Sequence, residues 1–255
     1  MIVQRVLLGN SGIKVSKLCI GTGTRAWGKS SKQTRRLGLQ GLADLLVYAY
    51  HKGITFIDTA DKYGSHPHVK EALNRLGREE LVVSTKTAAR TAKQMKSDLE
   101  RFRRELGTDY LDIVLLHCMT NKKWNLKLRP VMEVLSEAKE RGIVRAVGCS
   151  NHDYGALVTA AQEPWVDVVL VRLNPKGLYM EGSPGAIVSV IQQMKENGKG
   201  IYGMKVMGEG LLGHNPKAAI RYQLEAPVDA FVIGMENFEE VDENVRLIGE
   251  STMVY

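Results

Sequence analysis

The chain has 255 residues, of which 44% are hydrophobic and 25% charged, the usual mix of a folded globular protein. This composition excludes a disordered chain, a collagen-like fibre and a small disulfide-stapled domain, and the length allows one or two domains. Lys and Arg outnumber Asp and Glu by 35 to 28, a net charge of +7. The densest positive runs, 29–36 and 101–104, contain a single aromatic, Phe102, so we expect solvated surfaces and no nucleic-acid partner.

The three cysteines, Cys19, Cys118 and Cys149, are an odd number and lie far apart, which is typical of reduced thiols in the cytoplasm rather than of a disulfide framework. The first residues reach a Gly-Asn-Ser-Gly turn before any long apolar run, so we expect no signal peptide. No uninterrupted apolar run approaches ~18 residues, and we therefore expect a cytoplasmic protein without a membrane partner.

The chain begins with a segment, residues 2–15, that we expect to form a short β-hairpin. After it, short runs rich in Val, Ile and Leu alternate with longer segments of helical periodicity. The runs lie at 16–20, 55–57, 81–84, 111–116, 144–147, 166–173, 200–202 and 230–233. The helical segments lie at 37–52, 67–76, 92–106, 128–141, 154–162, 185–197, 216–224 and 238–247. Several runs, such as DIVLL and AFVI, have no polar alternation, which indicates parallel strands covered by helices.

Turn and cap residues fall at the ends of these helical segments. The glycines that suit the position directly after a helix are Gly53, Gly77, Gly107, Gly142 and Gly198. The residues that suit the N-cap position are Thr91, Asp153, Ser183 and Asn215. Eight strand–helix units in a chain of this length predict a (β/α)8 TIM barrel, with the hairpin capping its bottom. No linker divides the chain, so we expect a single domain over residues 1–255.

Polar residues follow three of the strands at the point where each run ends. Asp58 ends the second run, Lys86 the third and His117 the fourth, and Tyr63 follows Asp58 by five residues. Because the C-terminal ends of barrel strands meet at one face, we expect these side chains to form one site. They suit the reduction of a carbonyl: a Tyr hydroxyl donates a proton, an ammonium lowers its pKa, a carboxylate holds that ammonium, and an imidazole binds the carbonyl oxygen.

Two other interpretations stay open on these residues alone. Each side chain could be a structural group that bonds a neighbouring loop, and Lys86 could form a Schiff base, as in an aldolase-like barrel. The ordered set on consecutive strands favours the reductase interpretation.

Longer stretches of the sequence resemble the aldo-keto reductase family. These stretches are LGNSGIKVSKLCIGTGT near the start, GITFIDTADKYG, VVSTK, LGTDYLDIVLLH, GIVRAVGCSN and VIGMENFEEVDEN. The resemblance spans nearly all of the chain and implies reduction of an aldehyde or ketone with hydride from NAD(P)H. It implies that Tyr63 is the general acid and His117 orients the carbonyl, while Lys86, paired with Asp58, depresses the Tyr63 pKa.

The resemblance also implies a nicotinamide dinucleotide site, with NADP as the expected cofactor. The residues it assigns to the cofactor are Gly23, Thr24, Asp58, Ser150, Asn151, Met204, Gly234, Glu240, Glu243 and Asn244. Among them, Ser150 and Asn151 would hold the carboxamide. Glu243 and Asn244 would hold the adenine.

Three positions depart from the family's pattern. Leu170 replaces a Gln that contacts the carboxamide, Met204 replaces a Tyr beneath the nicotinamide, and Glu240 replaces an Arg at the 2′-phosphate. A carboxylate there repels a phosphate and can accept a hydrogen bond from a ribose hydroxyl, so we expect a weakened NADP preference, with NAD as an alternative cofactor. With a small shift of register, Lys205 or Arg246 could replace the missing Arg.

The remaining features concern the pocket, metals and assembly. Trp27 and Trp124 are candidates for the substrate pocket or for packing. The chain ends soon after the last helix, so the site is expected to be open or completed by another subunit, and a homo-oligomer stays an open alternative. His66 and His68 with Asp61 imitate a metal site, but a turn and helix cap explain them better, so we expect no metal. The alternative function is a cofactor-binding or regulatory protein with little turnover.

Overall fold

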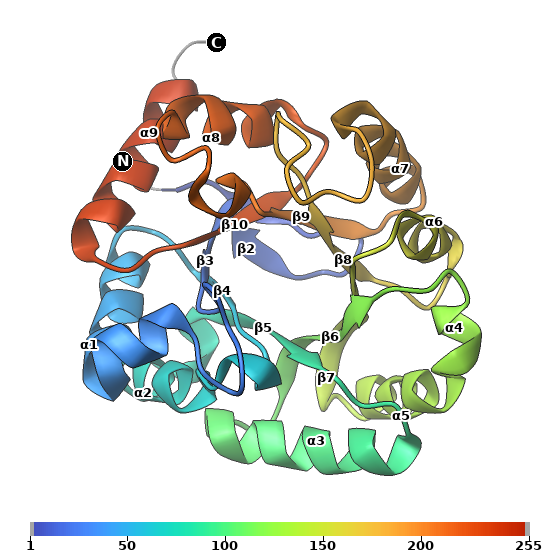
Figure 1. Cartoon of the computed structure of the whole chain (residues 1–255). Helices are drawn as coiled ribbons and strands as arrows, with labels where there is room; N and C mark the ends of the chain where they lie inside the picture. Colours follow the sequence, from blue (N-terminus) through green and yellow to red (C-terminus); the bar gives the residue numbers. More distant parts are fainter. Residues whose placement is uncertain (1–2, 253–255) are drawn as a thin grey trace.

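The computed structural model describes residues 3–252, so the two first and three last residues of the expected domain lie outside the described part. Parallel strands close into a barrel in the order β10-β3-β4-β5-β6-β7-β8-β9, with the helices around its outside (Figure 1). The barrel strands are β3 (Leu18–Gly21), β4 (Phe56–Asp58), β5 (Val82–Thr87), β6 (Leu111–Met119), β7 (Val144–Asn151), β8 (Val168–Arg172), β9 (Gly200–Met204) and β10 (Ala230–Gly234). The predicted (β/α)8 barrel is confirmed.

Helices follow the strands throughout the chain. They are α1 (Lys32–His51), α2 (His66–Leu76), α3 (Ala92–Leu106), α4 (Trp124–Lys127), α5 (Arg129–Glu140), α6 (Tyr154–Gln162), α7 (Pro184–Glu196), α8 (Pro216–Glu225) and α9 (Phe238–Thr252). The five glycines predicted to follow helices all have positive φ values, from 65° to 102°, which a residue with a side chain rarely adopts. The four predicted N-caps each accept a backbone N–H with the side chain.

Helix α1 begins five residues before the predicted segment, at Lys32 rather than at residue 37. Ser31 caps it through a capping box in which Thr34 takes the place of the usual Glu or Gln. Gly38, with φ 64° and ψ −173°, then interrupts the helix. The apolar periodicity therefore indicated only the part of the helix around and beyond this kink.

Other boundaries also differ from the prediction, among them the end of α9, which extends to Thr252. The predicted segment 128–141 is α5, which begins at Arg129, and the short helix α4 precedes it, with Leu128 between the two. Pro130 lies in the first turn of α5, where its missing N–H costs nothing. Ser16 belongs to the hairpin and not to the first barrel strand. Its Oγ accepts hydrogen bonds from the backbone N–H groups of Thr55 and Phe56 at 2.9 and 3.2 Å, so it links the hairpin to β4.

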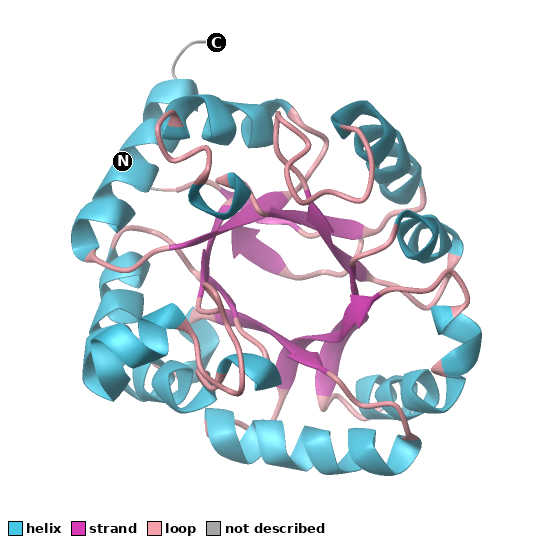
Figure 2. Ribbon diagram, in the orientation of Figure 1, coloured by secondary structure: helices cyan, strands magenta, loops and turns pink. Residues whose placement is uncertain are grey.

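The hairpin, β1 (Arg5–Leu7) and β2 (Lys14–Ser16), caps the N-terminal end of the barrel as predicted (Figure 2). The side chains that it and its turn pack into the barrel interior are Leu8, Ile13 and Val15. The backbone N–H of Asn10 donates to the carbonyl oxygen of Gly198 at 2.8 Å. A Cβ on Gly9 would lie 2.4 Å from the backbone nitrogen of Gly200, so this close approach requires glycine.

The larger hydrophobic cluster lies between the barrel and the helices, and the smaller one fills the barrel itself. The barrel is thus a packed core rather than a pore, which leaves its C-terminal face as the place for a site. Among the described residues, no helix is both long and apolar enough to cross a membrane.

Candidate active site

A buried ion pair joins β4 and β5 at the C-terminal end of the barrel. Lys86 Nζ donates to both carboxylate oxygens of Asp58 at 2.7 Å and to the carbonyl oxygen of Thr59 at 2.8 Å. Burial alone would lower the pKa of Lys86, but the charge and hydrogen bond of Asp58, together with the interaction with Tyr63, raise it above its usual value. The lysine is therefore a fixed ammonium at neutral pH.

Tyr63 lies over this ion pair. It ends a short 3₁₀ helix, η1 (Asp61–Tyr63), in the loop between β4 and α2, and Lys86 Nζ is 4.9 Å from the centre of its ring. A Cβ added to Gly23 would lie 2.3 Å from the Tyr63 ring, so the glycine in the β3–α1 loop makes room for this ring. Gly23, assigned to the cofactor by resemblance, thus supports the tyrosine directly.

The pKa of Tyr63 is not depressed, contrary to our expectation. Burial raises the pKa of its hydroxyl, the charge of Lys86 lowers it, and the balance lies above the usual value. The expectation was wrong because it considered only the charge of Lys86, which lowers the pKa. It omitted the burial of Tyr63, which raises the pKa. At neutral pH Tyr63 therefore carries the proton that a general acid must have.

His117 contributes an imidazole from β6. Its ring lies edge-on to that of Tyr63, with 5.7 Å between the ring centres and 80° between the planes. Burial, with 8% of the residue exposed, and then the charge of Lys86 lower the pKa of His117 to about 2. The neutral ring keeps one N–H donor, so it can bind a carbonyl oxygen without competing with Tyr63 as an acid. The structure thus brings all four predicted catalytic side chains into one site.

Sequence reasoning missed Tyr202, which lies on β9 inside the barrel. Its hydroxyl donates to Asp58 Oδ2 at 2.8 Å and is hydrogen-bonded to Ser84 Oγ, also at 2.8 Å. It therefore helps to hold the carboxylate whose other partner is Lys86. Its signal in the sequence was weak, because only closure of the barrel brings β9 across from β4.

Ser150 and Asn151 end β7 and are both buried. Ser150 Oγ accepts a hydrogen bond at 2.9 Å from the backbone N–H of Cys118, which has φ 60° at an irregularity of β6 directly after His117. Within the described residues, the side-chain amide of Asn151 has one hydrogen-bond partner, the sulfur of Cys149, at 3.5 and 3.8 Å. Sulfur is a weak partner, so this amide keeps hydrogen-bonding capacity for a ligand.

A second polar cluster joins the loops after β3 and β10. The buried side chain of Gln33 donates to the carbonyl oxygen of Gly21 at 3.0 Å and to Thr24 Oγ1 at 2.8 Å, and it accepts from the Thr24 N–H at 3.1 Å. A Cβ added to Gly234 would lie 2.2 Å from Thr24 Oγ1. Thr24 and Gly234, predicted separately from distant segments, are therefore neighbours.

The residues assigned to the adenosine end lie on the first turns of α9. The carboxylate of Glu240 accepts from the backbone N–H of Glu236 at 2.8 Å, and the side chain of Asn237 accepts from the Glu240 N–H at 2.7 Å. Glu240 is thus engaged in capping the helix. Asn244 donates to the Glu240 carbonyl oxygen at 2.7 Å, and Glu243 is exposed.

Two basic side chains that the sequence analysis did not single out face this loop from α1. Lys32 Nζ and Arg36 NH1 lie 2.9 and 2.6 Å from the carboxylate of Glu236. Both belong to the positive run 29–36, which was interpreted as a solvated surface. Lys205 and Arg246 were considered as replacements for the missing Arg at the 2′-phosphate. Each pairs with a carboxylate four residues further along its own segment.

The ends of β7 to β10 fit a nicotinamide dinucleotide. Leu170 is buried beside Ser150, and Met204 is partly buried against the same interior cluster, so both present apolar surface. Next to them are the under-used amide of Asn151 and the exposed backbone of Gly234. Apolar walls with a few polar groups suit a planar ring that carries a carboxamide.

The two candidate pocket tryptophans have different surroundings. Trp124 is buried and donates to the carbonyl oxygen of Ala156 at 3.1 Å, so it is a packing residue. Trp27 is 86% exposed in the β3–α1 loop and remains a candidate for the pocket rim.

Two of the three residues that imitated a metal site, His66 and Asp61, have other partners. His66 is hydrogen-bonded to Glu105 and Thr85 at 2.7 and 2.8 Å, and Asp61 pairs with Arg101 at 2.5 Å. Within residues 3–252, no group of three or more His, Cys, Asp or Glu is placed to hold a metal ion.

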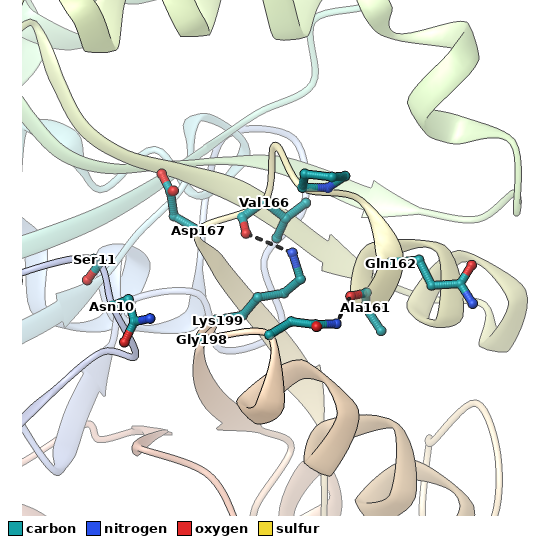
Figure 3. Close-up of a pocket in the computed structure, with 10 residues that line it drawn as sticks. Asn10, Ser11, Ala161, Gln162, Val166, Asp167, Gly198 and Lys199 are labelled. Atoms are coloured by element: carbon teal, nitrogen blue, oxygen red, sulfur yellow. Dashed lines mark hydrogen bonds between the residues drawn. The ribbon is translucent and has the colours of Figure 1, made fainter.

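A groove of about 350 Å³ lies at the opposite end of the barrel, between the hairpin turn and the loops that precede β8 and β9 (Figure 3). None of the four catalytic side chains lines it. Its buried lysine, Lys199, donates to the carbonyl oxygens of Glu163 and Val166 at 2.7 and 3.0 Å. The groove is thus a feature of the barrel bottom, far from the chemistry.

Comparison with known proteins agrees with this geometry. The model of the Aldo/keto reductase family matches residues 17–218. The NADH-specific methylglyoxal reductase of Escherichia coli is 24% identical over 233 residues, which cover 82% of this chain and 69% of that protein. The NADPH-dependent alpha-keto amide reductase of Saccharomyces cerevisiae is 30% identical over 156 residues, 58% of this chain and 49% of that protein.

A solved structure from Pseudomonas aeruginosa, described as an aldo-keto reductase, has a TM-score of 0.82 and 25% identity, and the match covers 97% of this chain and 95% of that one. The matches to the two curated enzymes cover about two thirds of the Escherichia coli enzyme and about half of the Saccharomyces cerevisiae enzyme. The family model, by contrast, matches most of this chain. The chain therefore belongs to the aldo/keto reductase family.

Proposed function

We propose that residues 1–255 form one domain, which reduces an aldehyde or ketone to an alcohol with a nicotinamide dinucleotide as the hydride donor. The observation that carries the proposal is the placement of a protonated Tyr63 over the buried Asp58–Lys86 pair, with the neutral imidazole of His117 beside it. The names of the two related enzymes, both reductases, support the same class of reaction.

Each side chain has a role that follows from its surroundings. The dinucleotide, when bound, supplies the hydride that adds to the carbonyl carbon. Tyr63 gives its proton to the carbonyl oxygen as negative charge develops there, and Lys86 stabilises the tyrosinate that remains. Asp58 keeps the ammonium in place, and His117 orients the carbonyl through an N–H donor. In the reverse direction the same groups oxidise an alcohol.

For the cofactor we propose NADP, with NAD as the alternative. The residues proposed to hold it are Gly23, Thr24, Asp58, Ser150, Asn151, Met204, Gly234, Glu240, Glu243 and Asn244. Lys32 and Arg36 offer the positive charge that a 2′-phosphate needs, but Glu236 already binds both, so a phosphate must displace this carboxylate. We therefore expect only a modest preference for one dinucleotide over the other.

Titration of the protein with NADPH and with NADH, followed by fluorescence, tests the proposal together with a turnover assay on a panel of small aldehydes. We expect binding of at least one dinucleotide and aldehyde-dependent loss of the reduced nicotinamide absorbance. Failure to bind either dinucleotide would contradict the proposal. Binding without turnover on any carbonyl would support the alternative, a cofactor-binding or regulatory protein.

A lyase that forms a Schiff base on Lys86 fits the site less well. Such a lysine needs a lowered pKa to be nucleophilic, whereas Asp58 raises the pKa of Lys86. Borohydride trapping of a carbonyl compound on Lys86 would support the lyase, and we expect none.

A further inference from the structure

The short loop that carries Tyr63 is tied down by one arginine of a neighbouring helix. Asp61 lies two residues before Tyr63 in η1, and its carboxylate is 2.5 Å from Arg101 NH1 and 3.5 Å from Lys29 Nζ. Arg101 lies in the middle of α3, the helix that follows β5. The loop after β4 is thus fixed by a side chain from the next strand–helix unit.

The same guanidinium has two further carboxylate partners. Arg101 NH2 lies 2.6 Å from Asp98, and NH1 lies 3.2 Å from Glu105. Asp98 accepts from Thr87 Oγ1 at 2.6 Å, and Glu105 is hydrogen-bonded to His66 Nδ1 at 2.7 Å. The planar guanidinium of an arginine can donate to several partners in fixed directions, whereas the ammonium of a lysine is a compact charge without such fixed directions.

These contacts reach both ends of the Tyr63 loop and both neighbours of Lys86. Asp61 precedes Tyr63 and His66 follows it, while Thr85 and Thr87 flank Lys86 on β5. His66 Nε2 also forms a hydrogen bond with Thr85 Oγ1 at 2.8 Å, which connects the loop to β5. Arg101 therefore joins the general acid's loop to the strand of the lysine that supports it, without touching the site.

The charges in this network depend on Arg101. Burial raises the pKa of Asp61, but its hydrogen bond and charge interaction with Arg101 bring it below the usual value. The hydrogen bond of His66 and the charge of Arg101 likewise keep the pKa of Glu105 below its usual value, against burial. Without the guanidinium, three carboxylates would face one another with Lys29 as the other cation on Asp61.

We propose that Arg101 is a positioning residue for the carbonyl reduction, which fixes the distance between Tyr63 and Lys86 through Asp61, Asp98 and Glu105. The inference rests on the proposed function. It explains the run of His66, His68 and Asp61 that imitated a metal site: two of its members anchor the catalytic loop instead.

The variant Arg101→Gln tests this role, with Arg103→Gln as a matched control. Arg103 lies on the same helix, and the carboxylates that it pairs with among the described residues, Glu100 at 3.3 Å and Asp109 at 3.9 Å, lie outside the Tyr63 loop. For Arg101→Gln we expect kcat to fall about ten- to a hundredfold, because small misplacements of reacting groups have effects of this size. KM and the dissociation constant of the dinucleotide should change by less than about threefold. Arg101→Lys should restore only part of kcat.

Hydrogen–deuterium exchange of residues 59–65 supplies a readout that does not require turnover. We expect faster exchange of this segment in Arg101→Gln than in the wild type or in Arg103→Gln. Unchanged kcat and unchanged exchange in folded Arg101→Gln would overturn the inference, as would a loss of kcat equal to that of Arg103→Gln. If the wild type itself reduces no carbonyl, the proposed function fails, and the exchange result then decides alone whether Arg101 anchors the loop.

Discussion

Lys86 and Lys199 are two buried lysines at opposite ends of one barrel, with 0% and 4% of their surface exposed. Lys86, near the C-terminal end of β5, binds both oxygens of a carboxylate and one carbonyl. Lys199, just before β9, binds two backbone carbonyls of the loop after α6. Burial lowers the pKa of Lys199, whereas at Lys86 the interactions with Asp58 and Tyr63 together outweigh burial and raise the pKa.

The difference shows that burial of a lysine does not by itself mark a functional site. Lys199 donates to two backbone carbonyls of the loop after α6 and so ties this loop to the start of β9, which is a structural task. Lys86 is a charge held beneath an ionisable tyrosine, an arrangement that suits the proposed proton transfer. The partner, rather than the degree of burial, separates the two cases.

We expect the largest effect from a substitution of Lys86, the lysine of the proposed catalytic site. Lys86→Met removes the charge that stabilises the tyrosinate, so we expect kcat to fall by about two to four orders of magnitude. Because the variant leaves Asp58 buried and unpaired, it should also lose about 3–5 kcal/mol of stability. The double variant Asp58→Asn with Lys86→Met should recover part of the stability and none of the activity, as measured by urea unfolding and by turnover.

The control for this prediction is Lys199→Met. It removes the Lys199 hydrogen bonds to the carbonyl oxygens of Val166 and Glu163, of which Glu163 still accepts from the Val166 N–H. We expect a loss of about 1–3 kcal/mol in urea unfolding and a kcat within about twofold of the wild type. A loss of activity in folded Lys199→Met as large as that in the Lys86 variants would show that the contrast between the two lysines is wrong.

A smaller effect should appear in the pH dependence of stability. His117 has a pKa of about 2 in the folded protein and about 6.5 when unfolded, so the unfolded state binds the proton more tightly and stability falls as the pH drops below 6.5. Between pH 6.5 and 5 this group accounts for a loss of about 1.5 kcal/mol. His117→Asn should therefore lose about that much less than the wild type over the same range. Urea unfolding at pH 6.5 and pH 5 measures both losses. If the wild type and His117→Asn lost the same stability between these pH values, His117 would not be buried in its neutral form.

The barrel and the catalytic set could be predicted because their signals are local. Asp58, Lys86 and His117 each end an apolar run, and parallel strands bring such ends to one face whatever the details of packing. The start of α1 was missed because Thr34 replaces the usual capping residue and Gly38 interrupts the periodicity.

The supporting residues could not be predicted, since their partners are distant in the chain. Tyr202 meets Asp58 across 144 positions, and Arg101 meets Asp61 across 40. No spacing rule joins such pairs before the barrel is closed. The sign of the Tyr63 pKa shift was missed for a related reason, because the burial of a side chain follows from the whole fold rather than from its neighbours in sequence.

The central claim is that Tyr63 donates the proton. The most direct test is the kcat of Tyr63→Phe in the NAD(P)H-dependent reduction of an aldehyde that the wild type accepts, with the dissociation constant of the dinucleotide measured alongside. The substitution keeps the ring that Gly23 accommodates and removes only the hydroxyl. We predict that kcat falls by about two to four orders of magnitude while dinucleotide binding changes by less than about threefold. A variant that retains more than about a tenth of the wild-type kcat would contradict the account.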